Sequence, residues 1–155
     1  MFEWVDPRAS PSNMNFGLLF VLVCVTALSG CTPAPAINSN SVASASDQRL
    51  ARAYAEEESH LQIEGTGTVI KLLDDDNEGS RHQRFIIRLE SGQTILVAHN
   101  IDLALRIDSL KVGDEVGFLG EYDWSPKGGT VHWTHHDPQG RHVAGWLKHE
   151  GRFYQ

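Results

Sequence analysis

The chain has 155 residues and a formal net charge of −7 at neutral pH. This length accommodates one domain with a modest hydrophobic core. The acidic balance argues against non-specific nucleic-acid binding and against electrostatic docking on anionic lipid, because both need a cationic face.

An apolar run from Phe16 to Leu28 lies near the N-terminus. A helix that crosses a bilayer needs about 20 such residues, whereas a signal-peptide core needs roughly 7 to 15. The run ends in Leu28-Ser29-Gly30-Cys31, which resembles a bacterial lipobox. We therefore expect residues 1–30 to be a lipoprotein signal peptide and Cys31 to carry lipid such as palmitate. The leading segment is poor in basic residues, which leaves the start at Met1 or Met14 open.

The residues after Cys31 indicate where the anchor leads. Thr32 stands in second place instead of Asp, a pattern similar to outer-membrane sorting in proteobacterial lipoproteins. Residues 31–48 are rich in Ala, Ser, Asn and Pro, which is typical of a flexible tether. We expect a lipid-anchored protein of the outer membrane that faces the periplasm. Its expected partners are the membrane, through the lipid, and an unidentified envelope ligand or protein.

A short helix is predicted for residues 49–60, where Leu50 and Tyr54 are four residues apart. Its arginines lie at the start and its glutamates at the end, which opposes the helix dipole. We therefore expect this helix to be short and frayed.

Residues 61–155 are predicted to form one small β domain. Apolar runs of strand length alternate with turn signals, and the five expected strands are residues 63–73, 82–89, 94–99, 115–122 and 130–135. Gly65 and Gly67 predict a bend or bulge in the first strand. A second helix is expected at residues 100–110, capped by Asn100 or Asp102, and a closing hairpin at residues 145–155.

The order of three strands, a helix and two strands is that of an OB-fold barrel. We therefore predict a mainly β fold: an OB-fold-like five-stranded barrel with one short helix and a C-terminal hairpin. An SH3-like barrel is the alternative, because spacing alone does not determine topology.

The densest group of potential ligands is His132-Trp133-Thr134-His135-His136-Asp137-Pro138, followed by Gly140-Arg141-His142. Histidine and aspartate bind metals and carry protons. On a straight strand His132 and His136 would lie about 13 Å apart, so the expected cluster is His136, Asp137 and His142, with His82 or His99 completing it. Zinc or another transition metal is the possible cofactor. The alternative is a polar loop whose histidines only cap strands.

A possible ligand face runs along the second strand, where Arg84 and Arg88 share one side with His82. OB-folds use their second and third strands to bind oligonucleotides or oligosaccharides, and Trp133 could stack on a base or sugar. The alternative is that both arginines pair with the abundant carboxylates. The acidic run after Asp74 is not expected to bind calcium, because Phe85 stands where an EF-hand needs a bidentate Glu.

Three stretches are similar to a bacterial family known as domain of unknown function 3465: Ser80-Arg81-His82-Gln83-Arg84-Phe85, Ala98-His99-Asn100-Ile101-Asp102 and His132-Trp133-Thr134-His135-His136-Asp137-Pro138. The resemblance covers about residues 65–155. It implies an uncharacterised envelope protein and brings no activity or catalytic residue with it.

Three functions stay open from the sequence. The first is a lipid-anchored envelope protein whose barrel binds an unknown ligand. The second is a metal-dependent hydrolase of phosphodiesterase or nuclease type, with His136 or His142 as base or ligand and Asp137 as ligand. The third is periplasmic metal binding by the same histidines.

Overall fold

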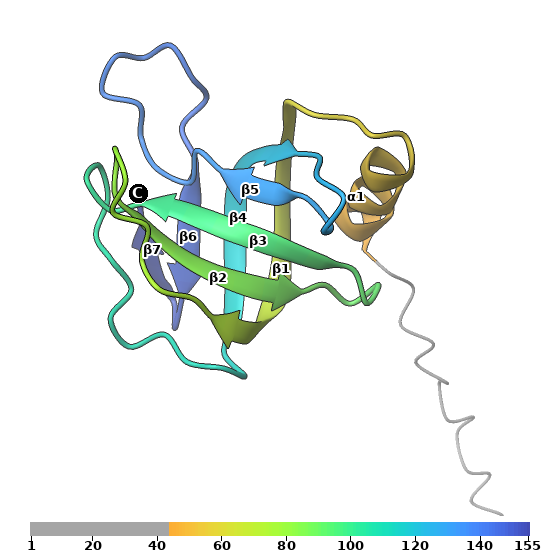
Figure 1. Ribbon diagram of the computed structural model, residues 1–155, viewed down its shortest axis with the longest axis horizontal. Coiled ribbons are helices and arrows are strands. Elements are labelled where there is room, and N and C mark those ends of the chain that lie inside the picture. Colours follow the sequence, from red (N-terminus) through yellow and green to blue (C-terminus); the bar gives the residue numbers. More distant parts are fainter. Residues whose placement is uncertain (1–43) are drawn as a thin grey trace, which may run out of the picture. The chain divides into compact units, whose positions relative to one another are not determined.

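The structure is a computed structural model that describes residues 44–155 (Figure 1). One helix, α1 (Ala45–Ala55), precedes the strands. The strands follow in chain order: β1 (Leu61–Leu72), β2 (His82–Arg88), β3 (Thr94–Asn100), β4 (Glu115–Asp123), β5 (Thr130–His132), β6 (Trp146–His149) and β7 (Arg152–Tyr154).

Strands β1 to β5 close into a barrel. The order is β1-β2-β3-β5-β4, and β4 returns to pair with β1. The β3–β5 pair is parallel, and the other pairs are antiparallel. This order confirms the OB-fold-like barrel and not the SH3-like alternative. The C-terminal hairpin β6–β7 is also confirmed and extends the sheet from β4.

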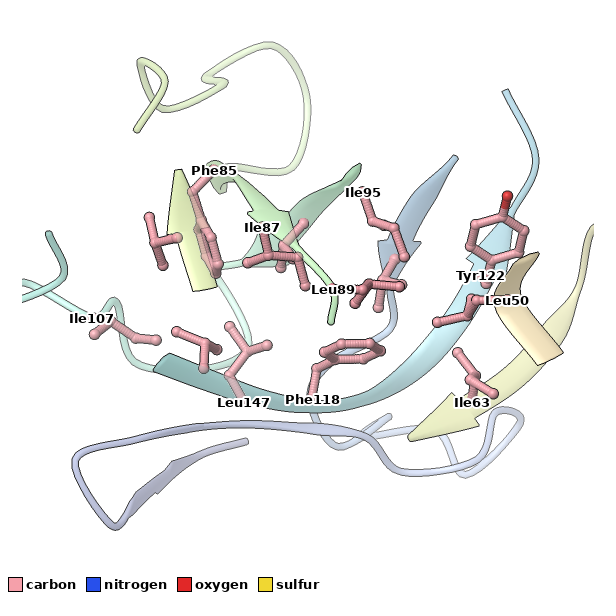
Figure 2. Packing of buried hydrophobic residues seen from close by; sticks show 14 of the residues in the cluster. Leu50, Ile63, Phe85, Ile87, Leu89, Ile95, Ile107, Phe118, Tyr122 and Leu147 are labelled. Carbon is pink, nitrogen blue, oxygen red and sulfur yellow. The ribbon is translucent and has the colours of Figure 1, made fainter. Parts of the chain in front are cut away.

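Alternation along the strands fills the barrel interior. In β2, β3 and β4 every second residue is buried, as the two-residue period of a strand requires. Phe85, Phe118 and Tyr122 are the largest fully buried side chains, and Figure 2 shows them among aliphatic side chains of the core. The intervening residues of these strands face outward and are available for a binding surface.

Strand β1 bends so that it can pair on both sides. Its first part pairs with β4 and its last residues pair with β2, with a register shift between Val69 and Lys71. The sequence suggests that Gly65 allows a bend, but the structure shows another reason for a glycine at this position. A Cβ there would lie 2.7 Å from the Phe118 ring, so the glycine makes room for that ring.

The helix lies further toward the N-terminus than the predicted residues 49–60. Ser44 caps it by accepting a hydrogen bond from the Asp47 backbone N–H at 3.1 Å. Asp47 in the first turn and Arg52 in the last suit the helix dipole, and the glutamates that seemed unfavourable follow the helix end. The prediction failed because the start was placed after the true cap.

The predicted helix at residues 100–110 is wrong. Asn100 does cap a single turn, because its side chain accepts from the Asp102 N–H and its carbonyl accepts from the Ala104 N–H. The chain then turns to β2, where the buried Gln83 amide bonds both the N–H and the carbonyl of Ile107 at 2.9 Å. This long-range pairing replaces further helical turns.

The fifth strand ends at His132, earlier than the predicted His135. Trp133 has φ 52°, a left-handed conformation that a strand cannot contain. The chain therefore leaves the sheet at Trp133, and residues 133–145 form the long loop between β5 and β6 that projects from the barrel in Figure 1.

Within residues 44–155, no helix is long and apolar enough to span a membrane. The predicted signal peptide, the predicted lipidation site Cys31 and most of the predicted tether lie outside the described residues.

Candidate functional site

A polar groove runs over the outer face of β2, β3 and β5. Its volume is about 400 Å³, and its floor is formed by Leu96 and Ala98 of β3. His82 and Arg84 of β2 form one wall, and His132 belongs to the other. A second hollow shares His82, Ala98 and His132 and extends the surface to Trp133. We call this continuous surface the β2–β3 groove.

One end of the β2–β3 groove meets a group of two carboxylates and three histidines. Its members, hereafter the carboxylate–histidine cluster, are His60, Glu121, Asp123, His132 and His142.

The fold brings these side chains together from four parts of the chain. Glu121 and Asp123 alternate with the buried Tyr122, so both carboxylates face outward from β4. His132 reaches them because β5 pairs with β4 in a register that sets Glu121 opposite His132. His60 comes from the connection between α1 and β1, and His142 from the β5–β6 loop.

Contacts within the carboxylate–histidine cluster are short. His60 Nδ1 lies 2.9 Å from Glu121 Oε1 and 3.5 Å from Asp123 Oδ1. His132 Nε2 lies 2.8 Å from Asp123 Oδ2, and His142 Nε2 lies 2.6 Å from Glu121 Oε2. The two carboxylates thus share three imidazoles.

These contacts shift the titration of the groups. The hydrogen bond to Glu121 and the nearby carboxylate charges raise the pKa of His60. Burial lowers the pKa of His142, but its hydrogen bonds to the Val143 carbonyl and to Glu121 outweigh that effect and raise it. Burial acts to raise the pKa of Glu121, but its hydrogen bonds to His60 and His142 outweigh burial, so the pKa of Glu121 lies below its ordinary value.

The three residues expected to form the site do not meet at one point. The Asp137 carboxylate accepts the backbone N–H groups of Gln139, Arg141 and His142, so it organises the loop. These bonds, with that of Gln139 first, lower the pKa of Asp137. His142 turns instead to Glu121, and His136 is exposed. Among residues 44–155, the group with metal-ligand spacing is His60, Glu121 and Asp123.

The other candidate histidines have different surroundings. His99 is fully buried, with Nδ1 2.8 Å from Thr134 Oγ1 and Nε2 3.2 Å from the Leu105 carbonyl. Both ring nitrogens of His99 are therefore used in hydrogen bonds inside the fold. His82 is half-buried on the outer face of β2 and lines the β2–β3 groove.

The proposed ligand face divides between two hollows. Arg84 lines the β2–β3 groove, where Nε donates to the Asp74 carbonyl at 3.1 Å and a terminal nitrogen lies 3.7 Å from Asp76. Trp133 stacks on His142 with 4.2 Å between ring centroids and 5° between planes. Arg88 lies at the far end of β2 and lines a different hollow.

The hollow that Arg88 lines lies over β1, and its volume of about 1070 Å³ exceeds that of the β2–β3 groove. Gly117 leaves part of this space open, because a Cβ there would point toward Trp146 and Lys148 in its lining. Its walls include more carboxylates than cations, with Arg88 and Lys148 as the two basic residues. We favour the β2–β3 groove as the functional surface because it adjoins the carboxylate–histidine cluster.

Sequence reasoning missed His60, Glu121 and Asp123. The predicted strand at residues 115–122 contained Glu121 but ended before Asp123, and the alternation Glu121-Tyr122-Asp123 is the signal that could have placed both carboxylates on one outward face. The register that places them beside His132 depends on long-range pairing, and His60 had no sequence signal beyond its residue type.

Comparison with protein families gives one finding. The model of the family described as "Protein of unknown function (DUF3465)" matches residues 34–155. The match confirms the resemblance carried by the three histidine-containing stretches and extends it toward the N-terminus. No curated protein matches the sequence significantly.

Proposed function

We propose that this chain, which belongs to the DUF3465 family of proteins of unknown function, is a lipid-anchored envelope protein whose barrel binds a glycan in the β2–β3 groove. The groove on the outer face of β2 and β3 is the observation that carries this proposal. Oligosaccharides and oligonucleotides are the ligands that OB-folds bind on this face.

The chemistry of the β2–β3 groove favours the glycan over a polyanion. Asp76 and Asp123 lie in the same groove as Arg84, so its aspartates outnumber its arginine by one and the groove is not cationic. A nucleic acid would need a cationic surface to release counterions. Sugar hydroxyls both donate and accept, and the histidines, arginine and aspartates of the groove match both roles.

The groove also has an apolar component that suits a sugar ring. Leu96 and Ala98 give the groove an apolar part of its lining. Trp133 borders the adjoining hollow and is held by its stack on His142. Pre-positioned side chains lower the entropic cost of binding, and the two acceptors around Arg84 hold its guanidinium in the same way.

The hydrolase hypothesis finds less support. It required His136, Asp137 and His142 to converge on one metal or water. The Asp137 carboxylate instead accepts hydrogen bonds from three backbone N–H groups of its own loop.

A binding experiment with variants tests the glycan proposal. The detergent-solubilised protein is titrated with soluble peptidoglycan fragments and other envelope oligosaccharides by isothermal calorimetry. Ala98→Trp should block the groove, and Arg84→Ala should weaken binding at least fivefold, corresponding to the loss of about 1 kcal/mol for a hydrogen bond. Lys148→Ala, in the larger hollow over β1, is the matched control and should bind as the unaltered protein does.

Two outcomes would contradict the proposal. One is an Ala98→Trp variant that still binds the glycan with unchanged affinity. The other is stronger binding of single-stranded DNA than of any glycan, which would make the domain a nucleic-acid binder despite its charge.

The anchor is a separate part of the proposal and rests on the Leu28-Ser29-Gly30-Cys31 motif. Cys31→Ala should remove the lipid and move the protein from the membrane fraction to the soluble fraction, because the acyl chains supply the membrane affinity. Cell fractionation with labelled palmitate measures this. A Cys24→Ala variant is the control and should stay lipidated.

A further inference from the structure

We propose that the carboxylate–histidine cluster is a binding site for a divalent transition metal of the zinc class, with His60, Glu121 and Asp123 as ligands. His132 is the fourth ligand, and His142 holds Glu121 in place. This site differs from the one expected in the His132–His142 stretch, and it does not depend on glycan binding.

The ligand atoms already have nearly the spacing that a metal requires. In a tetrahedral zinc site with bonds of about 2.0–2.2 Å, neighbouring ligand atoms are about 3.3–3.6 Å apart. His60 Nδ1 lies 2.9 Å from Glu121 Oε1 and 3.5 Å from Asp123 Oδ1. These three residues each offer one atom within 4.8 Å of the others.

His132 is placed to complete the set. Its Nε2 lies 2.8 Å from Asp123 Oδ2 and 3.9 Å from Glu121 Oε1. It contacts both carboxylates from the side of β5, whereas His60 approaches from the α1–β1 connection. His132 is not in the group of three whose ligand atoms already lie within 4.8 Å of one another, so the proposal requires its side chain to move toward His60 when the metal binds.

The surrounding contacts hold the ligands in position, as is usual around metal ligands. Glu121 offers Oε1 to the proposed metal, and its other oxygen, Oε2, bonds His142 Nε2 at 2.6 Å. His142 is fixed in turn by the Val143 carbonyl at 2.9 Å and by the stack with Trp133.

His60 is exposed, yet its backbone is anchored. Its N–H donates to Asp123 Oδ1 at 3.0 Å, and the neighbouring Ser59 hydroxyl accepts the Trp124 N–H at 3.0 Å. His60 also has φ 60°, an uncommon backbone conformation for residues other than glycine. These bonds direct the imidazole toward β4.

The donor set determines the kind of metal. Two imidazoles and two carboxylates suit zinc and its first-row neighbours, whereas calcium and magnesium prefer oxygen ligands alone. The two carboxylates also supply the negative charge that balances a divalent cation. The acidic groups of the loop after Asp74 offer only oxygen ligands, and two of them, Asp75 and Asp76, pair with Arg106 and Arg84.

The test uses the full-length protein in detergent, stripped of metal and titrated with zinc chloride by calorimetry. Cobalt(II) is added in parallel, because its visible absorption reports tetrahedral coordination by nitrogen and oxygen. We expect one zinc per chain and a melting temperature that rises with zinc. His60→Asn and Glu121→Gln should each weaken binding more than tenfold, and His142→Gln should weaken it about 10–100-fold through Glu121.

The variants are chosen to keep the fold. Asparagine tolerates the left-handed backbone at position 60, and glutamine retains the length and an oxygen acceptor at position 121. Melting without metal verifies that both fold. His136→Ala is the matched control, because it removes an exposed histidine of the adjacent loop and should leave zinc binding unchanged.

Three results would overturn the site. The first is no zinc binding and no melting shift at millimolar zinc. The second is unchanged affinity in both His60→Asn and Glu121→Gln. The third is an equal loss in His136→Ala, which would mean diffuse capture by surface histidines. Because Arg84→Ala removes a groove residue and no proposed zinc ligand, zinc binding and glycan binding can fail independently.

Discussion

His99 shows how a single residue couples this fold to pH. Its lowered pKa keeps the buried ring neutral near neutral pH. The Leu105 carbonyl can only accept a hydrogen bond, so in the neutral ring Nε2 carries the proton and Nδ1 accepts from the Thr134 hydroxyl. Burial lowers its pKa to about 4, even though the bond to Leu105 acts in the opposite direction.

This pKa predicts a loss of stability in acid. Between pH 6.5 and 4 the unfolded chain binds a proton at His99 that the folded chain does not bind, so the free energy of unfolding falls as pH falls. The full effect is about 3 kcal/mol. His99→Gln, which can keep both hydrogen bonds, should have a shallower dependence in urea unfolding between pH 7 and pH 4.5. His136→Gln is the control, and an unchanged slope in His99→Gln would contradict the assignment.

His60 and His142 act in the opposite sense. Their pKa values are raised in the folded protein, so their contributions are complete below the ordinary histidine pKa and are lost as pH rises through the folded values. The exposed position of His60 makes its contribution small. Of these three histidines, His99 is therefore the one that makes the folded protein less stable as pH falls from 6.5 toward 4.

Gly129 is a residue at which two demands coincide. It has φ 94°, and a Cβ there would lie 2.1 Å from the Tyr122 ring. Gly92 has a similar φ of 89°, but nothing lies within 4 Å of its added Cβ. Comparing alanine substitutions at Gly92 and Gly129 therefore separates the cost of backbone strain, which both share, from the cost of steric overlap, which only Gly129 has.

We predict that Gly92→Ala costs about 1–2 kcal/mol, which is the price of a left-handed alanine. Gly129→Ala should cost this amount and a further 1–3 kcal/mol for overpacking against Tyr122. Chemical denaturation measures both values. Equal costs in the two variants would show that the ring moves away freely.

At the scale of elements, α1 closes one end of the barrel. Leu50 and Ala53 are fully buried in the core cluster, and Figure 2 shows Leu50 next to Tyr122 and Ile63. Asp47, also buried, accepts the Ser91 N–H at 2.9 Å and so joins the helix to the β2–β3 turn. The helix is held by this packing, since a helix of its length is marginal alone.

Leu50→Ala should therefore lower the free energy of unfolding by about 2–5 kcal/mol, because it leaves a cavity under the barrel end. Arg49→Ala, on the exposed side of the same helix, should change it by less than about 0.5 kcal/mol. Thermal and urea unfolding report the two values. A Leu50→Ala protein as stable as Arg49→Ala would mean that α1 does not belong to the core.

The elements also show what sequence could predict. The strands followed from their period-two alternation, which the barrel interior requires, and the order of elements predicted the OB-like barrel. The helix at residues 100–110 failed because Gln83 binds the Ile107 backbone across 24 residues. The fifth strand was drawn too long because nothing in the sequence indicated a left-handed Trp133.

The candidate site was harder to predict than the fold. Its histidine-rich stretch was found, and His142 of the expected trio does reach the carboxylate–histidine cluster. The Asp137 carboxylate accepts hydrogen bonds from backbone N–H groups of its own loop, and the spacing of residues in the sequence does not reveal such bonds. Glu121 meets His132 only through the β4–β5 register, so the cluster needed the three-dimensional structure.

At the scale of the whole molecule, the barrel presents two adjoining polar features on one outer surface. The β2–β3 groove and the carboxylate–histidine cluster meet at Asp123 and His132. The proposed tether would hold this surface away from the membrane. An acidic barrel on the proposed lipid anchor would suit the capture of an uncharged or weakly charged ligand.

The most direct test of the binding proposal is nuclear magnetic resonance mapping of the isotopically labelled protein during titration with peptidoglycan fragments. We predict that the amide signals of the groove strands move, led by His82, Arg84, Leu96, Ala98 and Thr130. Signals around Gly65, Gly67 and Gly117 should stay in place. Shifts confined to the hollow over β1, or no shifts at any ligand concentration, would contradict the assignment of the β2–β3 groove as the glycan-binding surface.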